Sequence, residues 1–257
     1  MTPVLSVEGL SKRFGGVTAV DDVSFSVAAG ELLAMIGPNG AGKSTCFNLV
    51  GGQLKPDRGR VRLFDHDLVG LPPRRIWRFG VGRTFQITAV FQSMTVVENV
   101  QMALISGRRR MGALWPKASH LYVDEALELL SRVGMLDQAD RACSVLAYGD
   151  LKRLELAVAL ANAPKLLLMD EPTAGMAPAE RIELMQLTSA IVRERGISVL
   201  FTEHDMDVVF AHASRIIVLN RGRLVAAGVP AAVRADPSVQ EIYLGSAGTP
   251  APSGSPA

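Results

Sequence analysis

Cysteine is scarce in this 257-residue chain, which contains only Cys46 and Cys143. The two residues lie far apart, and neither has a partner at the CxxC or cysteine–histidine spacing that zinc sites use. Disulfide frameworks need several cysteine pairs and are typical of oxidising compartments. The sequence therefore argues against a zinc site and a disulfide scaffold, and it favours a protein of a reducing compartment.

Long apolar runs are also missing. No segment approaches the ~20 consecutive apolar residues that a membrane-spanning helix needs. The first ten residues, MTPVLSVEGL, lack the basic and apolar regions of a secretory signal peptide. If the protein acts at a membrane, we therefore expect another subunit to hold it there.

Neither sign of charge is in large excess. The 27 lysines and arginines are nearly balanced by 25 acidic residues, which leaves a net charge of +2. This charge is too small to indicate a nucleic-acid-binding surface, so nucleic acid is not an expected partner. The one basic cluster, GRRRMG at 107–112, is most simply a solvated loop between helices; contact with a partner or with lipid head groups is the alternative.

The hydrophobic pattern predicts strands and helices that alternate along the chain. Strands are expected at 4–10, 20–27, 31–37, 60–64, 165–170 and 197–202, helices at 43–52, 95–105, 122–135, 151–163 and 178–196, and a hairpin at 215–228. An alternating pattern interrupted by a block of helices predicts an α/β domain with an inserted helical subdomain. Residues 246–257 are mainly Gly, Ala, Pro and Ser and are expected to be disordered.

The segment GPNGAGKST at 37–45 matches G-x-x-x-x-G-K-[ST] between an expected buried strand and a helix. Glycines let such a loop curl so that its backbone N–H groups face one phosphate chain, and the helix N-terminus adds partial positive charge. Lysine reaches the terminal phosphates and serine ligates Mg²⁺. The motif predicts a nucleotide phosphate site formed by Gly37, Asn39, Gly40, Gly42, Lys43, Ser44 and Thr45.

A pair of carboxylates ends the apolar strand KLLLMDEP at 165–172. The carboxyl ends of parallel strands line the ligand crevice of α/β sheets. Asp170 is therefore a candidate to hold Mg²⁺, directly or through water, and Glu171 a candidate to orient the attacking water. The alternative is an exposed acidic strand end without a function. The presence of a phosphate-loop motif in the same chain favours the functional interpretation.

Three single residues are less specific on their own. His204 follows another apolar strand and is a candidate γ-phosphate contact, although a lone histidine is more often structural. Gln86, in RTFQ, lies where the first α/β part meets the helical block. Phe14 is either a core residue or a stacking surface for adenine.

Taken in order, these motifs resemble the ATP-binding cassette of ABC transporters, from about Val4 to Gly245. RTFQ, LAYG followed by KRLE, EHDM and the closing DPSVQEIYLG are similar to the ATPase subunits of branched-chain amino acid importers. The resemblance implies a P-loop NTPase core with an antiparallel β subdomain, formed by 1–87 and 164–245, and a helical subdomain at 88–163.

The resemblance also implies roles for the single residues. Phe14 becomes the adenine-stacking residue, Gln86 a Mg²⁺ and water contact that senses the membrane subunit, and His204 the γ-phosphate contact. The signature at 146–150 would contact ATP bound to a second subunit through Ala147, Gly149 and Asp150. The implied cofactors are ATP and Mg²⁺, and the implied catalytic residues are Glu171, His204 and Gln86.

The implied assembly contains transmembrane permease subunits, a second ABC ATPase subunit and, indirectly, an extracytoplasmic solute-binding protein. Its ATPases would lie on the cytoplasmic face of the cell membrane. The alternatives are uptake of urea or a related solute, lipopolysaccharide export, which shares the YLG ending, and a soluble ABC ATPase outside transport. The last kind usually carries two cassettes or a long coiled coil, and neither occurs in this sequence.

Two positions depart from the general cassette pattern. The signature usually reads LSGGQ, whereas this one ends in Asp150, and Ala177 stands where an Asp or Asn is usual. We expect Asp150 to cap its helix. Ala177 precedes Pro178, a favourable first helical residue, so the loop at Ala177 either leads into a helix or has lost a polar contact across the dimer. Both departures would face the partner's ATP.

Overall fold

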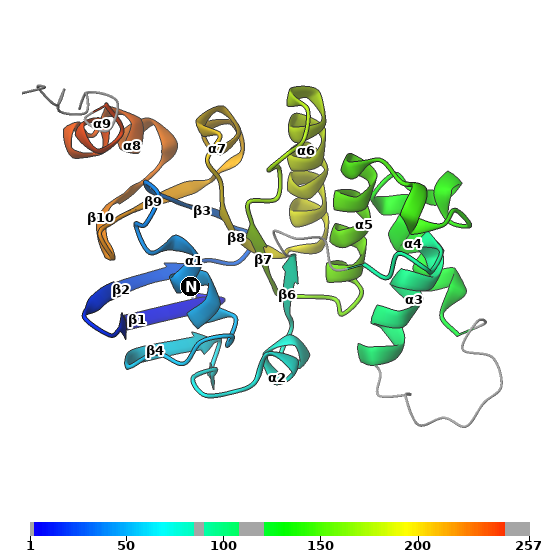
Figure 1. The fold of residues 1–257 in the computed structure, drawn as a ribbon, viewed down its shortest axis with the longest axis horizontal. Coiled ribbons are helices and arrows are strands. Elements are labelled where there is room, and N and C mark those ends of the chain that lie inside the picture. The colour runs from blue at the N-terminus through cyan, green and yellow to red at the C-terminus, as the bar shows by residue number, and fades with distance from the viewer. Residues whose placement is uncertain (1–2, 85–89, 108–120, 245–257) are drawn as a thin grey trace, which may run out of the picture.

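The protein is described by a computed structural model that covers residues 3–84, 90–107 and 121–244. Gln86, nearly all of the basic cluster at 107–112 and the tail at 246–257 lie outside these described residues. The described part contains two β-sheets, a helix between them and a group of helices on one side (Figure 1).

A six-stranded sheet forms the centre of the fold, in the order β10-β9-β3-β8-β7-β6. Its strands are β3 (Leu32–Ile36), β6 (Val81–Thr84), β7 (Leu166–Asp170), β8 (Ser198–Thr202), β9 (Arg215–Asn220) and β10 (Arg223–Gly228). All neighbouring strands are parallel except β9 and β10, which form the expected hairpin. The central strands β3, β7 and β8 are mainly apolar and buried, as is typical of parallel strands with both faces covered.

A four-stranded antiparallel sheet packs over one face, in the order β2-β1-β4-β5. Its strands are β1 (Leu5–Phe14), β2 (Val17–Val27), β4 (Arg58–Leu63) and β5 (His66–Asp67). Helix α1 (Lys43–Val50) lies between the two sheets (Figure 1). Its Cys46 and Phe47 are completely buried in a core shared by residues of both sheets, and this core fixes the position of the helix that follows the phosphate loop.

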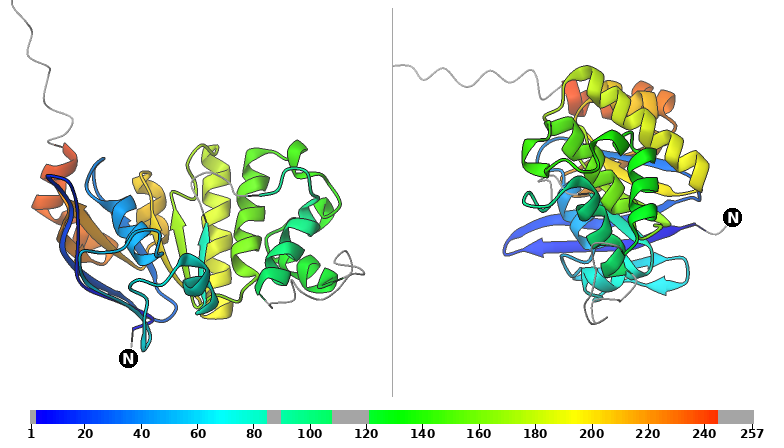
Figure 2. Two further views of the ribbon diagram at one scale, coloured as in Figure 1. Left: turned by 60° about the horizontal axis from the view of Figure 1, so that its bottom comes forward. Right: turned by 90° about the vertical axis from the view of Figure 1, so that its right-hand side faces the viewer.

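Helices cover the opposite face of the parallel sheet. Helix α6 (Pro178–Arg195) and α7 (Met206–His212) pack there, and α3 (Val96–Gly107), α4 (Val123–Arg132) and α5 (Tyr148–Leu160) form the helical block. Figure 2 (left) shows this block in green on the far side of α6 from the blue antiparallel sheet. Short helical turns at Leu136–Gln138 and Cys143–Val145 complete it. Two C-terminal helices, α8 (Pro230–Ala235) and α9 (Pro237–Leu244), pack on β10.

The expected fold class, an α/β core with an antiparallel sheet and a helical block, is confirmed. In the described part of 88–163 the only β pairing is a single bridge between Thr95 and Ala142. No helix in the described residues combines the length and the apolar character that crossing a membrane requires.

The expectation that Asp150 caps a helix is wrong. The N-cap of α5 is Ala147, and Asp150 is the third residue of the helix, in its first turn. A carboxylate there still interacts favourably with the positive end of the helix dipole. The helix begins earlier than expected because Tyr148 and Gly149 adopt helical conformations that the apolar pattern does not reveal.

Candidate functional site

The carboxyl ends of β3, β7 and β8 lie at one edge of the parallel sheet, and the residues that follow them border a pocket of about 520 Å³. The residues after β3 are the phosphate loop, and Glu171 and His204 follow β7 and β8. Parallel strands carry their following loops to the same edge, which is why motifs more than 120 residues apart meet here. The pocket is lined by Val17, Thr18, Ala19, Asn39, Gly40, Ala41, Gly42, Lys43, Ser44, Thr45, Glu171, His204 and Arg221.

The phosphate loop depends on backbone conformations that favour glycine. Gly40 and Gly42 have φ angles of +77° and +102°, and Gly42 is the N-cap of α1. A Cβ atom at Gly42 would lie 2.3 Å from the carbonyl oxygen of Ala19, far inside van der Waals contact. The loop therefore packs closely against the backbone of β2 and points the first N–H groups of α1 into the pocket.

The Lys43 side chain is folded back along the loop. Its Nζ donates hydrogen bonds to the carbonyl oxygens of Gly37, at 2.7 Å, and Pro38, at 3.2 Å. Burial lowers the pKa of the Lys43 ammonium, while the nearby carboxylates of Glu171 and Asp170 oppose that shift. A phosphate anion would provide the ammonium with a stronger partner than these neutral carbonyls.

Glu171 and His204 form a contact at the mouth of the pocket, with 2.8 Å between Glu171 Oε1 and His204 Nε2. Glu171 adopts φ +49°, a conformation that costs a non-glycine residue on the order of 1–3 kcal/mol. Its N–H donates to Thr202 Oγ1 at 3.0 Å, which helps to hold the strained residue in place. Such strain is concentrated at functional sites, and Glu171 lines the pocket.

Asp170 lies beside Glu171 and has two neighbours. Its Oδ1 accepts a hydrogen bond from Thr202 Oγ1 at 2.8 Å, and its Oδ2 lies 3.8 Å from an Arg83 guanidinium nitrogen. No group of three or more histidine, cysteine or acidic side chains that could hold a metal occurs in the described residues. This donor set fits Mg²⁺, which binds through one or two protein oxygens and takes its other ligands from phosphates and water.

The remaining predicted site residues lie elsewhere. Phe14 ends β1 with 47% of its surface exposed, near the Val17–Ala19 edge of the pocket, and its adenine-stacking role stays a prediction. Ala147, Gly149 and Asp150 lie at the start of α5 and are not part of the pocket lining. Ala177 is the N-cap of α6, and Pro178 is its first residue, as expected for a loop that leads into a helix.

The sequence did not single out Glu203, which is 3% exposed between the two halves of the site. Its carboxylate accepts hydrogen bonds from the backbone N–H and the hydroxyl of Thr173, at 2.8 and 2.7 Å. These bonds tie the segment after β8 to the segment after β7, where His204 and Glu171 lie. An acidic residue within TEHDM, next to the histidine, is the only signal that the sequence offers.

Replacement of Glu203 by Gln is expected to change how stability depends on pH. Burial raises the pKa of the Glu203 carboxyl, although its hydrogen bonds with Thr173 oppose the shift. The folded protein then holds this proton more tightly than the unfolded chain, so stability is greatest below the unfolded pKa of about 4.3 and falls as pH rises through the folded pKa. Urea unfolding between pH 4 and 8 should show Glu203→Gln gaining stability relative to the unmodified protein as pH rises.

The control for this measurement is Glu241→Gln, which removes a carboxyl from an exposed position on α9. Its stability relative to the unmodified protein should change much less over the same pH range. A difference between Glu203→Gln and the unmodified protein that is constant from pH 4 to 8 would contradict the prediction.

Comparison with known proteins identifies the relatives of this chain. Residues 20–174 match the ABC transporter family, and residues 223–250 match the family described as branched-chain amino acid ATP-binding cassette transporter. The chain is 42% identical over 253 residues to the high-affinity branched-chain amino acid transport ATP-binding protein LivG of Salmonella typhimurium, a match that covers 95% of this chain and 99% of LivG.

Solved structures give the same relationship. The ADP conformation of MJ1267, an ATP-binding cassette of an ABC transporter, is similar with a TM-score of 0.84 and 32% identity, over 95% of this chain and 100% of that one. A dimeric post-hydrolysis state of the ATP-binding cassette MJ0796, bound to ADP and phosphate, is similar with a TM-score of 0.75 and 26% identity, over 88% and 98% of the two chains.

Proposed function

We propose that this chain powers an importer of branched-chain amino acids. It belongs to the ABC transporter family of ATP-hydrolysing proteins. One observation of the structure carries the ATPase part of the proposal: the phosphate loop, Glu171 and His204 border a single pocket. The solute is proposed from the 42% identity to LivG and from the match of residues 223–250 to the branched-chain family.

The residues of the pocket have distinct roles in the proposed reaction. The glycine-rich loop binds the phosphates through backbone N–H groups, and Lys43 turns from the Gly37 carbonyl toward the terminal phosphates. Glu171 orients the attacking water and accepts its proton, and His204 holds the Glu171 carboxylate in position and contacts the γ-phosphate. Ser44 and Asp170 would hold Mg²⁺, with Gln86 as a further ligand; when bound, the ion neutralises developing charge on the phosphates.

The working form in this proposal is a dimer with a second ATPase subunit. The signature residues lie outside the chain's own pocket, and they are proposed to contact the ATP of the partner. The related cassette MJ0796 is dimeric in the structure described above. Because Asp150 and Ala177 are the altered positions, we further propose that the ATP site they face is the weaker one. Replacing Glu171 of this chain and the corresponding glutamate of the second ATPase subunit in turn tests this asymmetry, and equal losses of ATPase activity would contradict it.

Replacement of Asp150 by Gln is expected to strengthen ATP binding by the dimer. Removing one negative charge from the vicinity of the partner's γ-phosphate should raise the affinity by about tenfold, the scale that Coulomb's law gives at an intermediate dielectric. Equilibrium binding of a fluorescent ATP analogue to the assembled complex measures the effect. An affinity equal to that of the unmodified complex would leave Asp150 with only its favourable position in the first turn of α5.

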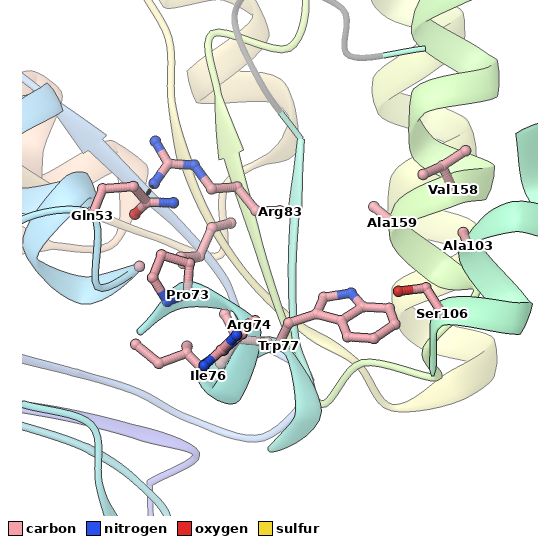
Figure 3. A pocket seen from close by; sticks show the side chains of 13 residues that line it. Gln53, Pro73, Arg74, Ile76, Trp77, Arg83, Ala103, Ser106, Val158 and Ala159 are labelled. Atoms are coloured by element: carbon pink, nitrogen blue, oxygen red, sulfur yellow. Dashed lines mark hydrogen bonds between the residues drawn. The ribbon is translucent and has the colours of Figure 1, made fainter. Parts of the chain in front are cut away.

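A groove between α2 (Pro73–Arg78), β6, α3 and α5 is the proposed contact site for a membrane subunit. It has a volume of about 380 Å³, and Figure 3 shows the Trp77 side chain extending across it toward Ser106 of α3. Strand β6 borders the groove, and Gln86 follows its last residue by two positions in the sequence. A membrane subunit bound here would position the ATPase at the cytoplasmic face of the cell membrane.

Isolation of the tagged protein from membranes in mild detergent tests the proposed assembly. A hydrophobic permease subunit and a second ATPase should co-purify, and uptake of labelled leucine by the cells should be lost with Glu171→Gln. The surface substitution Glu183→Gln on α6 provides the control, with uptake unchanged. Co-purification with ribosomes or DNA would refute a role in transport, and loss of urea uptake without loss of leucine uptake would refute the proposed solute.

A further inference from the structure

Arg83 on β6 reaches from the groove to the nucleotide site. One guanidinium nitrogen donates to Gln53 Oε1 at 2.6 Å and the other to Asn48 Oδ1 at 2.9 Å. The second nitrogen also lies 3.8 Å from Asp170 Oδ2, so that a single side chain contacts the end of α1, the segment after it and the carboxylate proposed to hold magnesium. The Arg83 and Asp170 side chains are each 13% exposed, and water screens this ion pair only weakly.

From these contacts we infer that Arg83 is a positioning residue that competes with Mg²⁺ for Asp170. The inference rests on the proposed ATPase site. At 3.8 Å the Arg83 guanidinium stabilises the ionised form of Asp170 but is too far from Oδ2 to form a hydrogen bond. Oδ2 can therefore still bind another ligand. When the carboxylate binds a divalent ion, the nearby guanidinium repels that ion and must weaken its binding.

The surroundings give the guanidinium room to move away from Asp170. Both Arg83 and Gln53 line the groove of about 380 Å³, whose lining contains no residue of the phosphate loop, and Figure 3 shows the hydrogen bond between them. Gln53 is exposed, so its amide can follow the arginine outward. Arginine remains protonated even though burial lowers its pKa, so movement rather than loss of a proton is what releases the carboxylate.

Arg83→Gln tests the inference through the magnesium dependence of nucleotide binding. The full-length protein is titrated with Mg²⁺ in the presence of a fluorescent ATP analogue, and the half-saturating Mg²⁺ concentration is measured. Arg83→Gln should lower it by about fivefold or more, because one positive charge is removed from beside the ion. Arg83→Lys, which keeps the charge, should stay near the unmodified value. Arg74→Gln is the matched control, since Arg74 lines the same groove but is exposed on α2.

Two further variants make the result decisive. Arg83→Met keeps the apolar stem and provides a second charge-free variant should Arg83→Gln fail to fold. In an Asp170→Asn background, Arg83→Gln should leave the half-saturating Mg²⁺ concentration unchanged, because the carboxylate for which the two cations compete is gone. An unchanged or raised half-saturating Mg²⁺ concentration in the charge-free variants, or a decrease that persists with Asp170→Asn, would overturn the inference. Failure of the unmodified protein to bind the ATP analogue would instead count against the proposed ATPase site.

Discussion

Replacement of Glu171 by Gln is expected to reduce ATP turnover by about 10²–10⁴-fold while ATP binding is retained, since that range is the usual contribution of a general base. The amide has the size of the carboxylate and can still meet His204, which lies 2.8 Å away, but it cannot accept a proton from water. The loss should therefore appear in kcat, with little change in the equilibrium affinity for ATP.

Single-turnover hydrolysis and equilibrium ATP binding, measured on the same preparation, separate these two effects. Glu183→Gln removes a carboxylate from the exposed surface of α6, and its turnover should equal that of the unmodified protein. Turnover by Glu171→Gln within tenfold of the unmodified rate would show that another group accepts the proton.

The second large effect is expected for Gly42→Ala. The φ angle of +102° costs an alanine on the order of 1–3 kcal/mol, and the added Cβ would lie 2.3 Å from the Ala19 carbonyl oxygen. Together these should lower the free energy of unfolding by at least about 3 kcal/mol. Displacement of the loop should also weaken ATP binding by about 100-fold, because the N–H groups at the start of α1 no longer converge on the phosphates.

Gly40→Ala is the matched control for this prediction. Its φ angle is also in the left-handed region, at +77°, but a Cβ there meets no atom within 4 Å. It should therefore show the conformational cost alone, about 1–2 kcal/mol. Urea unfolding and ATP binding of the two variants separate the cost of the backbone conformation from the cost of the contact with Ala19. Equal losses of stability and of ATP affinity in Gly42→Ala and Gly40→Ala would show that the contact with Ala19 has no effect.

Patterns that depend on residues close together in sequence predicted much of the fold. The phosphate loop, the acidic pair after β7 and the hairpin at 215–228 each combine a short motif with a strand or helix beside it, so local chemistry is enough to identify them. The helical block was predicted for the same reason, because the helical spacing of its apolar residues is a local signal.

Elements that depend on distant contacts were missed. Strand β6 has only four residues and is held by pairing with β7, about 85 positions away. Helix α2 has six residues, most of them basic or proline, and its one fully buried side chain is Ile76. Neither shows a periodic apolar pattern, so their formation follows from packing and not from local preference.

The same limit applies to the candidate site. Helix α7 begins at Met206 and is capped by Asp205, whose carboxylate accepts hydrogen bonds from the N–H groups of Asp207 and Val208. This cap lies within the segment that was interpreted only as a histidine motif. The contacts of Arg83 with Asn48 and Asp170 join segments 35 and 87 positions apart, and no spacing rule connects them.

The internal hydrogen bonds of Lys43 have a consequence for the speed of the catalytic cycle. Because the ammonium is bonded to the carbonyls of Gly37 and Pro38, the Lys43 side chain itself supports the curvature of the loop. When the products leave, the Lys43 ammonium returns from phosphate oxygens to these two carbonyls, and the loop does not have to refold. We expect each new ATP to meet a preorganised loop, so that the slow step of repeated turnover lies in the opening and closing of the dimer.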